Sequence, residues 1–169
     1  SDVYKRQVKG YDIASVKSDL VFIKNTIQEA VEDAGIVFVA VPTPHEQEYD
    51  GSLPTAHLPP KDFNYDIVKQ VLIETNKHMN KRQLLCLVST VIPGTVRSIL
   101  QPLITNTRFV YNPYLIAMGS VAWDMVNPEM VMIGTEDGTE TGDAKELVNF
   151  YKTIMENNPR SELGTWDEC

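Results

Sequence analysis

The chain has 169 residues, of which 43% are hydrophobic and 22% charged, a composition typical of one globular domain with a substantial core. Its formal net charge of −8 argues against a nucleic acid or an anionic membrane as the main partner, because both are bound through clustered Lys and Arg. No apolar stretch approaches the roughly 20 residues that span a bilayer, and no signal-peptide pattern opens the chain. We therefore expect a cytoplasmic protein that binds a small molecule.

Neither end of the chain resembles the end of a natural domain. The chain lacks an initiating Met, and Ser1–Gln7 (SDVYKRQ) resembles the translation of a sequencing adapter. We expect a non-native leader over 1–7, a partial domain over 8–160, and over 161–169 the start of a connection to a central helix and a second domain. The chain is accordingly expected to be a piece of a longer protein.

The N-terminal third predicts a strand followed by a helix. The run Val8–Ile13 (VKGYDI) is a short apolar segment that closes on Asp12. Thr26 and Glu29 have the spacing of a capping box, which predicts a helix that ends near Gly35.

Three apolar runs then end abruptly in turns bounded by proline. They are Ile36–Pro44, Leu84–Pro93 and Phe109–Pro113. Such runs suit strands that are buried on both faces, as in a parallel sheet. Between and after them we expect helices at about 65–79 and 143–155, a short helix opened by Gly94 and Thr95, and a further strand at Met130–Ile133.

The alternation of strand and helix predicts an α/β fold with a Rossmann-like, doubly wound, mostly parallel sheet. In such sheets ligands bind beyond the carboxyl ends of the strands. Here those ends carry small hydrogen-bonding side chains, namely Thr43, Ser89, Thr90 and Asn112. We expect them to form the rim of a site, although Thr43 and Thr90 are also ordinary residues for turns after strands.

Asp12 is a second indication of a cofactor site. In dinucleotide-binding folds an acidic residue at the end of the second strand accepts hydrogen bonds from the adenosine ribose, although an Asp after a strand is also a common turn residue. The strand and glycine-rich phosphate turn that normally precede it would lie before residue 1, and the sequence contains no G-x-G-x-x-G. We therefore expect a sheet truncated at its N-terminal edge.

Neither the cysteines nor the histidines predict a catalytic or metal centre. Cys86 falls in a predicted buried strand, where a thiol has no access and no lowered pKa, and Cys169 is the last residue. A disulfide is not expected. His45, His57 and His78 lack metal-ligand spacing, so we expect surface histidines and no metal.

The segment from His45 to Asp62 (HEQEYDGSLPTAHLPPKD) is a long, polar, proline-rich loop. Loops of this length are often functional. Two alternatives are open for this loop: it forms a flap over the site, or it is a solvated excursion.

Several motifs together resemble one family. They are VPTP at Val41–Pro44 followed by DGS at Asp50–Ser52, STVIPGT at Ser89–Thr95, YNP at Tyr111–Pro113, GSVAWD at Gly119–Asp124 and NPEMVMIG at Asn127–Gly134. In this order and spacing, from about Val8 to Glu168, the chain resembles the N-terminal domain of the nucleotide-sugar dehydrogenases, whose best-known member oxidises UDP-glucose to UDP-glucuronate.

The resemblance implies an NAD-binding domain over 8–160. Asp12 matches the family's ribose-binding acid, and Lys17 matches a basic residue near the adenosine. Thr43 and Thr90 match threonines that line the NAD site, and Thr90, near the reacting centre, is the candidate catalytic residue. For the complete protein the resemblance implies a homodimeric UDP-sugar 6-dehydrogenase of polysaccharide biosynthesis, with a nucleotide sugar as its substrate.

The resemblance also implies substrate contacts at Asn112, Tyr114 and Met118. At the last two positions the best-known members carry glutamates, where a carboxylate can position water for thioester hydrolysis. Tyr and Met cannot act as a carboxylate base. We favour altered substrate handling over inactivity. The family's cysteine nucleophile, lysine and asparagine belong to a second domain and a connecting helix, so the chain alone is expected to be inactive.

Three hypotheses remain open. The favoured one is the NAD-binding part of a nucleotide-sugar dehydrogenase that oxidises a UDP-glucose-like hexose. The second, suggested by Tyr114 and Met118, is a catalytically silent Rossmann-type nucleotide-binding module. The third is another two-domain NAD(P)-dependent dehydrogenase, such as a β-hydroxyacid type, which Asp12 alone would allow but the STVIPGT and NPEM motifs disfavour.

Overall fold

The computed structural model describes residues 8–10, 21–49, 52–115 and 120–169. Its elements are β1 (Val8–Gly10), β2 (Val21–Ile23), α1 (Ile27–Val31), β3 (Ile36–Val39), the 3-10 turn η1 (Gln47–Tyr49), α2 (Asp66–His78), β4 (Leu84–Leu87), the π-helical turn η2 (Val96–Leu100), the 3-10 turn η3 (Gln101–Leu103), β5 (Arg108–Tyr111), α3 (Val121–Asp124), β6 (Met130–Thr135), α4 (Gly142–Tyr151) and β7 (Arg160–Thr165). Asp12, Lys17 and Met118, three of the predicted site residues, lie outside the described part of the chain.

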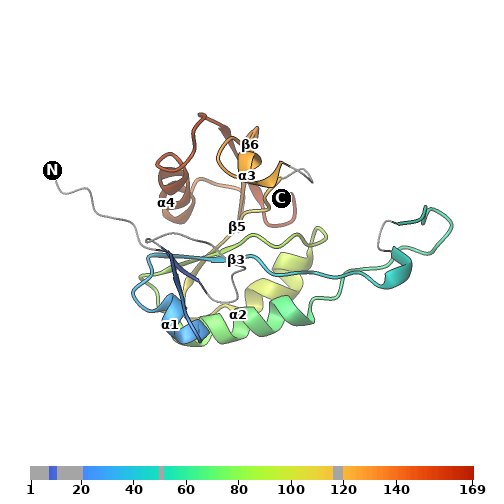
Figure 1. Ribbon diagram of the computed structural model, residues 1–169, viewed down its shortest axis with the longest axis horizontal. Coiled ribbons are helices and arrows are strands. Elements are labelled where there is room, and N and C mark those ends of the chain that lie inside the picture. The colour runs from blue at the N-terminus through green and yellow to red at the C-terminus, as the bar shows by residue number, and fades with distance from the viewer. Residues whose placement is uncertain (1–7, 11–20, 50–51, 116–119) are drawn as a thin grey trace.

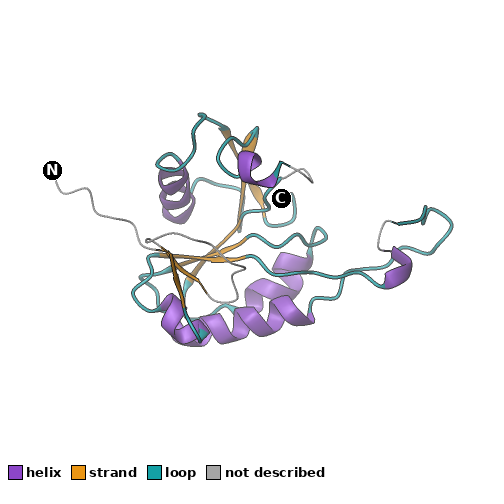
Figure 2. Cartoon of the chain, in the orientation of Figure 1, coloured by secondary structure: helices purple, strands orange, loops and turns teal. Residues whose placement is uncertain are grey.

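The central sheet has five strands in the order β3-β4-β5-β6-β7, and β1 and β2 form a separate parallel pair. The pairs β3–β4, β4–β5 and β6–β7 are parallel, whereas β5 and β6 are antiparallel and share the single pair Tyr111 and Gly134. Figure 2 shows helices on both sides of these strands. The predicted α/β fold with a mostly parallel, Rossmann-like sheet is confirmed.

Strand β4 lies at the centre of two cores, one on each face of the sheet. Its four side chains are fully buried, and they alternate between the faces. Leu85 and Leu87 pack with α2 and η2, whereas Leu84 and Cys86 pack with α4 and β6. Figure 1 shows α1 and α2 on one side of the sheet and α4 on the other. Burial on both faces explains why this strand reads as a continuous apolar run.

The predicted N-terminus of α1 is confirmed, but its predicted end is wrong. The Thr26 hydroxyl accepts from the Glu29 amide at 3.2 Å, as a capping residue should. The helix ends at Val31, before Gly35, and Asp33 takes the left-handed φ of 61°. Asp is one of the few residues besides glycine that tolerate this conformation at modest cost.

Other predicted boundaries shift for physical reasons. Regular pairing ends at Val39 in β3 and at Leu87 in β4, well before the prolines that bound the two apolar runs. The helix predicted after Gly94 is a π turn followed by a 3-10 turn, where Pro102 has no amide to donate to a regular helix. The last predicted helix, α4, ends at Tyr151 and continues as turns.

The C-terminal residues form a strand that the sequence did not predict. We expected 161–169 to begin a connection out of the domain, but β7 pairs in parallel with β6 over six residues. Trp166 follows it, is buried, and has its ring 5.8 Å from that of Phe109. Residues up to Trp166 are therefore part of this fold.

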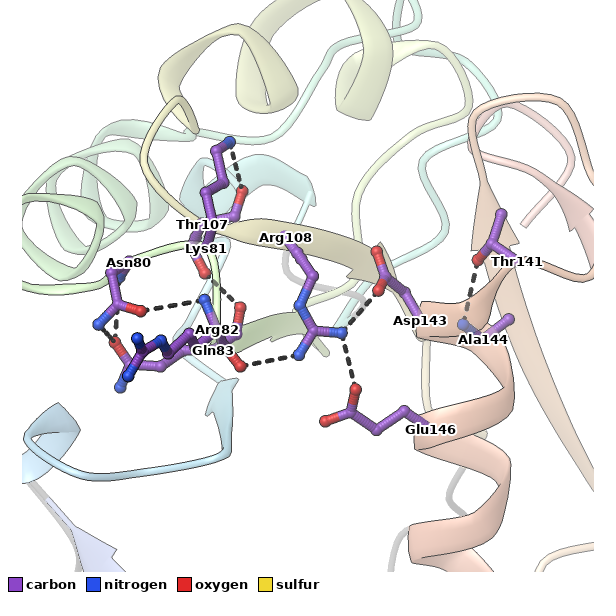
Figure 3. A network of polar contacts seen from close by, with 10 residues as sticks. All are labelled: Asn80, Lys81, Arg82, Gln83, Thr107, Arg108, Thr141, Asp143, Ala144 and Glu146. Carbon is purple, nitrogen blue, oxygen red and sulfur yellow. Dashed lines mark hydrogen bonds and ion pairs between the residues drawn. The ribbon is translucent and has the colours of Figure 1, made fainter.

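A polar network joins the amino ends of β4 and β5 to α4 (Figure 3). One guanidinium nitrogen of Arg108 lies 2.7 Å from carboxylate oxygens of both Asp143 and Glu146, and another donates to the Arg82 carbonyl at 2.9 Å. The Thr107 hydroxyl donates to the Gln83 carbonyl at 2.7 Å. These contacts hold the amino ends of the strands together, at the end of the sheet opposite to the predicted site.

Among the helices of the described ranges, none has the length and apolar character that crossing a membrane requires.

The Gln83 side chain ties α1 to β4, and its loss should be costly. Its amide nitrogen donates to the carbonyls of Val31 and Ala34 at 2.8 and 2.9 Å, and its oxygen accepts from the Asn80 amide at 3.0 Å. Gln83→Ala removes all three bonds. The Val31 carbonyl keeps its bond from the Ala34 amide, but the Ala34 carbonyl loses its partner, so the free energy of unfolding should fall by about 1–3 kcal/mol in denaturant titrations. Gln70→Ala, at an exposed position of α2, is the matched control. Equal unfolding midpoints for the two variants would contradict this account.

Candidate functional site

Two predicted site residues meet beyond the carboxyl ends of β3 and β4. The Thr43 hydroxyl donates to the carbonyl oxygen of Thr90 at 2.8 Å. Thr43 is half-buried, whereas Thr90 is exposed. Since the Thr43 hydroxyl holds the backbone of Thr90, the two residues form one unit with the Thr90 side chain on its outer surface.

Ser89, also predicted at the rim, links the segment that follows β4 to the segment that follows β3. Its hydroxyl accepts from the Val41 amide at 2.8 Å and donates to the Val41 carbonyl at 2.7 Å. The side chain is buried, and its one donor is committed to Val41. Ser89 therefore fixes the spacing of the segments that carry Thr43 and Thr90.

The two backbone amides after Thr90 are held by tyrosine hydroxyls. The Val91 amide donates to the Tyr111 phenol oxygen at 3.4 Å, and the Ile92 amide donates to that of Tyr65 at 3.2 Å. Burial raises the pKa of both phenols, with the hydrogen bond to Asp62 as a second cause for Tyr65, so both stay protonated at neutral pH. The sequence singled out Tyr111 only as part of the YNP motif and Tyr65 not at all, because both look like ordinary core residues.

Gly94 and Thr95 lie where η2 begins. Gly94 has a φ of 87°, and a Cβ built there would meet nothing within 4 Å, so the backbone conformation and not the available space requires glycine. The Thr95 hydroxyl is buried and donates to the Tyr65 phenol oxygen at 3.2 Å.

Asn112 is fully buried at the end of β5. Its amide nitrogen donates to the Met132 carbonyl at 2.6 Å, and its oxygen accepts from the Tyr151 hydroxyl. The side chain therefore joins β5 to β6 and α4. Its predicted contact with substrate stays a prediction. Tyr151, which the sequence did not single out, is its main partner.

Tyr114, at the position of the first family glutamate, is half-buried, and its hydroxyl donates to the Met125 carbonyl at 2.8 Å. Burial raises the pKa of this phenol. At neutral pH Tyr114 is therefore a neutral group whose one donor is already engaged.

The family of the chain follows from its similarity to known proteins. Residues 2–155 match the NAD binding domain of the UDP-glucose/GDP-mannose dehydrogenase family. The chain belongs to this family. The predicted resemblance is confirmed, and so is NAD as the cofactor.

Individual relatives are distant, and the chain covers only part of each. It is 24% identical over 166 residues to the uncharacterized protein MJ1054 of Methanocaldococcus jannaschii, covering 98% of this chain and 17% of that protein. It is 25% identical over 138 residues to UDP-glucose 6-dehydrogenase of Rickettsia typhi, covering 80% of this chain and 29% of that protein. A ternary complex of GDP-mannose dehydrogenase from Pseudomonas aeruginosa superposes with a TM-score of 0.66 at 18% identity, over 88% of this chain and 33% of that chain, which shows the shared fold.

The cysteines of this NAD-binding domain are free. Cys86 is fully buried as predicted, and burial raises the pKa of its thiol far above the usual range. Cys169 is half-buried, and its thiol pKa is raised by burial and, secondly, by the charge of Glu168. Neither thiol is therefore activated as a nucleophile in this structure.

The histidines differ from one another. His57 is exposed as predicted, but His45 is half-buried, stacked 5.0 Å from the Tyr49 ring and 4.6 Å from that of Phe63. His78 pairs with Glu74 at 3.0 Å. Within the described ranges, no three His, Cys, Asp or Glu residues gather as metal ligands would.

The long loop after β3 extends away from the body of the molecule (Figure 1). The Asn64 amide donates to the Pro44 carbonyl at 2.8 Å at its base, Lys61 pairs with Glu46 at 2.5 Å, and the Tyr49 hydroxyl donates to the Pro59 carbonyl at 2.7 Å. Of the two open alternatives, this arrangement favours a solvated excursion over a flap.

Asn112 should contribute to stability through Tyr151. Asn112→Ala leaves the buried Tyr151 hydroxyl without its acceptor and removes the bond to the Met132 carbonyl, so the free energy of unfolding should fall by about 2–3 kcal/mol. Adding Tyr151→Phe should then cost less than the same substitution in the native chain, because the two residues are coupled. Asn149→Ala, on the exposed side of α4, is the control. Strictly additive losses in chemical denaturation would rule out the coupling.

The two cysteines should differ sharply in reactivity. Iodoacetamide reacts with the thiolate, so raising the pH from 7 to 9 should speed alkylation of Cys169, while Cys86 stays unmodified in the folded chain. In denaturant both should react. Peptide mass spectrometry after timed quenching measures each site, and rapid native alkylation of Cys86 would show that β4 opens far more readily than its burial implies.

Proposed function

We propose that the complete protein to which this chain belongs oxidises the primary alcohol of a nucleotide-bound hexose of the UDP-glucose type to the uronic acid, with NAD as the oxidant. The observation that carries the proposal is the Thr43–Thr90 unit. It supports the proposal because it holds the exposed residue Thr90 beyond the carboxyl ends of β3 and β4, the region where ligands of open α/β sheets bind, within a chain that belongs to an NAD-dependent family.

The residues at this rim fit a cofactor that carries many hydrogen-bonding oxygens. Thr90 is exposed and carries a hydroxyl. Thr43 bonds its carbonyl, and Ser89 and the two phenols hold the residues on either side of it. NAD supplies the hydride acceptor when bound. From the family resemblance we assign Asp12 to the adenosine ribose and Lys17 to the neighbourhood of the adenosine. Asp12 should favour NAD over NADP, because a carboxylate accepts from a 2′-hydroxyl and repels a 2′-phosphate.

The substrate assignment rests on the segment after β5. We place the sugar near Tyr114 and Met118, with Asn112 holding the backbone that precedes them. Because Tyr114 is a neutral phenol, a different group must orient the water that converts the bound acyl intermediate to the carboxylate. The family contains relatives described as UDP-glucose 6-dehydrogenase and as GDP-mannose dehydrogenase, so the sugar and its nucleotide are the finer part of the proposal.

The balance of the reaction defines its signature. Oxidation of a primary alcohol to a carboxylate removes four electrons, consumes one water and reduces two molecules of NAD. From the family resemblance we also propose that the complete protein is a cytoplasmic homodimer that supplies an activated uronic acid for polysaccharide synthesis.

One observation favours a second candidate function. The absence of both glutamates, with Tyr114 bonded to Met125, is also the pattern expected of a silent nucleotide-binding module. Such a module would bind NAD without oxidising any sugar.

The decisive experiment uses the complete protein with NAD or NADP and a panel of UDP- and GDP-sugars. We expect two NADH per uronic acid formed, with UDP-glucose-like substrates and with NAD preferred. Thr90→Val should lower kcat/KM about tenfold at unchanged melting temperature, since it removes one hydroxyl bond worth about 1–1.5 kcal/mol and keeps the branched shape.

Thr55→Val, the same substitution in the long loop, is the control and should leave both quantities unchanged. NAD binding without NADH formation across the panel would replace the enzyme with the silent module. Unchanged kinetics with a large loss of stability in Thr90→Val would remove Thr90 from the site.

A further inference from the structure

We propose that Tyr65, oriented by Asp62, is a positioning residue that fixes the backbone on which Thr90 is presented. The inference rests on the proposed function of Thr90 and goes beyond it, because Tyr65 lies on a different element, at the start of α2, and belongs to none of the motifs at the rim.

The Tyr65 hydroxyl makes three hydrogen bonds, two as an acceptor and one as a donor. It accepts from the Ile92 amide at 3.2 Å and from the Thr95 hydroxyl at 3.2 Å, and it donates to a carboxylate oxygen of Asp62. A phenol has one proton to donate. The Tyr65 hydroxyl uses this proton in its hydrogen bond to Asp62. Towards segment 89–95 the phenol oxygen can therefore only accept hydrogen bonds.

Asp62 is itself fixed by the backbone. The same carboxylate oxygen accepts from the Phe63 amide at 2.7 Å, a bond between neighbouring residues. The Tyr65 ring is buried among the residues that pack between α2, β4 and η2. The hydroxyl is therefore held from both sides, by packing of its ring and by a carboxylate acceptor.

Segment 89–95 is held largely by side chains, with one internal backbone bond from the Thr95 amide to the Ile92 carbonyl at 3.1 Å. Strand pairing continues only to the Val88 amide, which donates to the Val39 carbonyl at 2.8 Å. Beyond it, Ser89 bonds Val41, Thr43 bonds the Thr90 carbonyl, and the next two amides donate to Tyr111 and Tyr65.

The two phenols do not hold the segment equally. The bond from Val91 to Tyr111 is long at 3.4 Å, and Tyr111 has no carboxylate partner in the described part of the chain. Tyr65 makes the shorter bond and adds a second through Thr95. We therefore assign the larger positioning effect to Tyr65.

A merely structural role for Tyr65 makes a different prediction. If the hydroxyl only contributed to the core, its removal would lower the melting temperature and leave the kinetics of the folded enzyme unchanged. If it positions Thr90, its removal should also alter NAD-dependent kinetics well below the melting temperature, because small misplacements of a reacting group are costly.

The test compares Tyr65→Phe with Tyr49→Phe in the complete protein. The Tyr49 hydroxyl likewise has an acceptor, the Pro59 carbonyl, but lies in the long loop away from Thr90. We expect Tyr65→Phe to lower kcat/KM for NAD about tenfold at a temperature where it is fully folded. Tyr49→Phe should match the native enzyme in kinetics.

Asp62 provides the conservative rescue. Asp62→Asn keeps an oxygen that can accept from Tyr65 and should retain most of the activity, whereas Asp62→Ala should resemble Tyr65→Phe. Both variants remain informative if Tyr65→Phe proves too unstable to assay.

A readout without catalysis comes from amide hydrogen exchange on the 169-residue chain. In Tyr65→Phe the Ile92 amide should exchange at least about tenfold faster, while amides of β4 keep their protection. Native kinetics and native Ile92 exchange in Tyr65→Phe would overturn the positioning role. A native protein that binds no NAD would instead overturn the proposed function, so the two failures are distinguishable.

Discussion

The parallel register of β3, β4 and β5 is the constraint on which the candidate site depends. Val39 pairs with Leu87, and Leu87 pairs with Tyr111, so the three strands end level at one edge of the sheet. Burial of β4 on both faces holds this register, because a shift of one residue would exchange the side chains of the two cores. Residues 47 positions apart in the chain, Thr43 and Thr90, meet as a direct result.

Beyond this edge, hydroxyl groups replace backbone pairing. A strand that leaves its sheet exposes amides and carbonyls that still need partners. Here Ser89 satisfies both groups of Val41, and phenols accept from the two amides after Thr90. Hydroxyls suit this task because each can both donate and accept, and because their geometry does not require a neighbouring strand. Side-chain hydrogen bonds therefore continue the ordered contacts of the sheet beyond its last backbone pairs.

Local pattern in the sequence predicts part of this structure. Continuous apolar runs gave the positions of β3, β4 and β5 and predicted the buried Cys86. The Thr26 cap gave the start of α1, and the motifs led to Thr43 and Thr90. The sequence could not predict Tyr65 or Tyr151 as polar partners, because a buried tyrosine has the same pattern whether or not its hydroxyl is used. It also missed β7, whose run RSELGT alternates weakly at the edge of the sheet.

The role of Asn112 follows partly from its sequence motif and partly from the contacts of its side chain. The motif marks the position, and the structure shows both ends of its side chain engaged with Met132 and Tyr151. A buried amide with satisfied partners rigidifies the backbone around it, since each unpaired group would cost free energy. The same argument applies to Tyr114, whose proton is committed to Met125. Under the proposed function, the groups that act on the substrate at this end of β5 therefore come from elsewhere, and Asn112 and Tyr114 act by fixing the backbone around it.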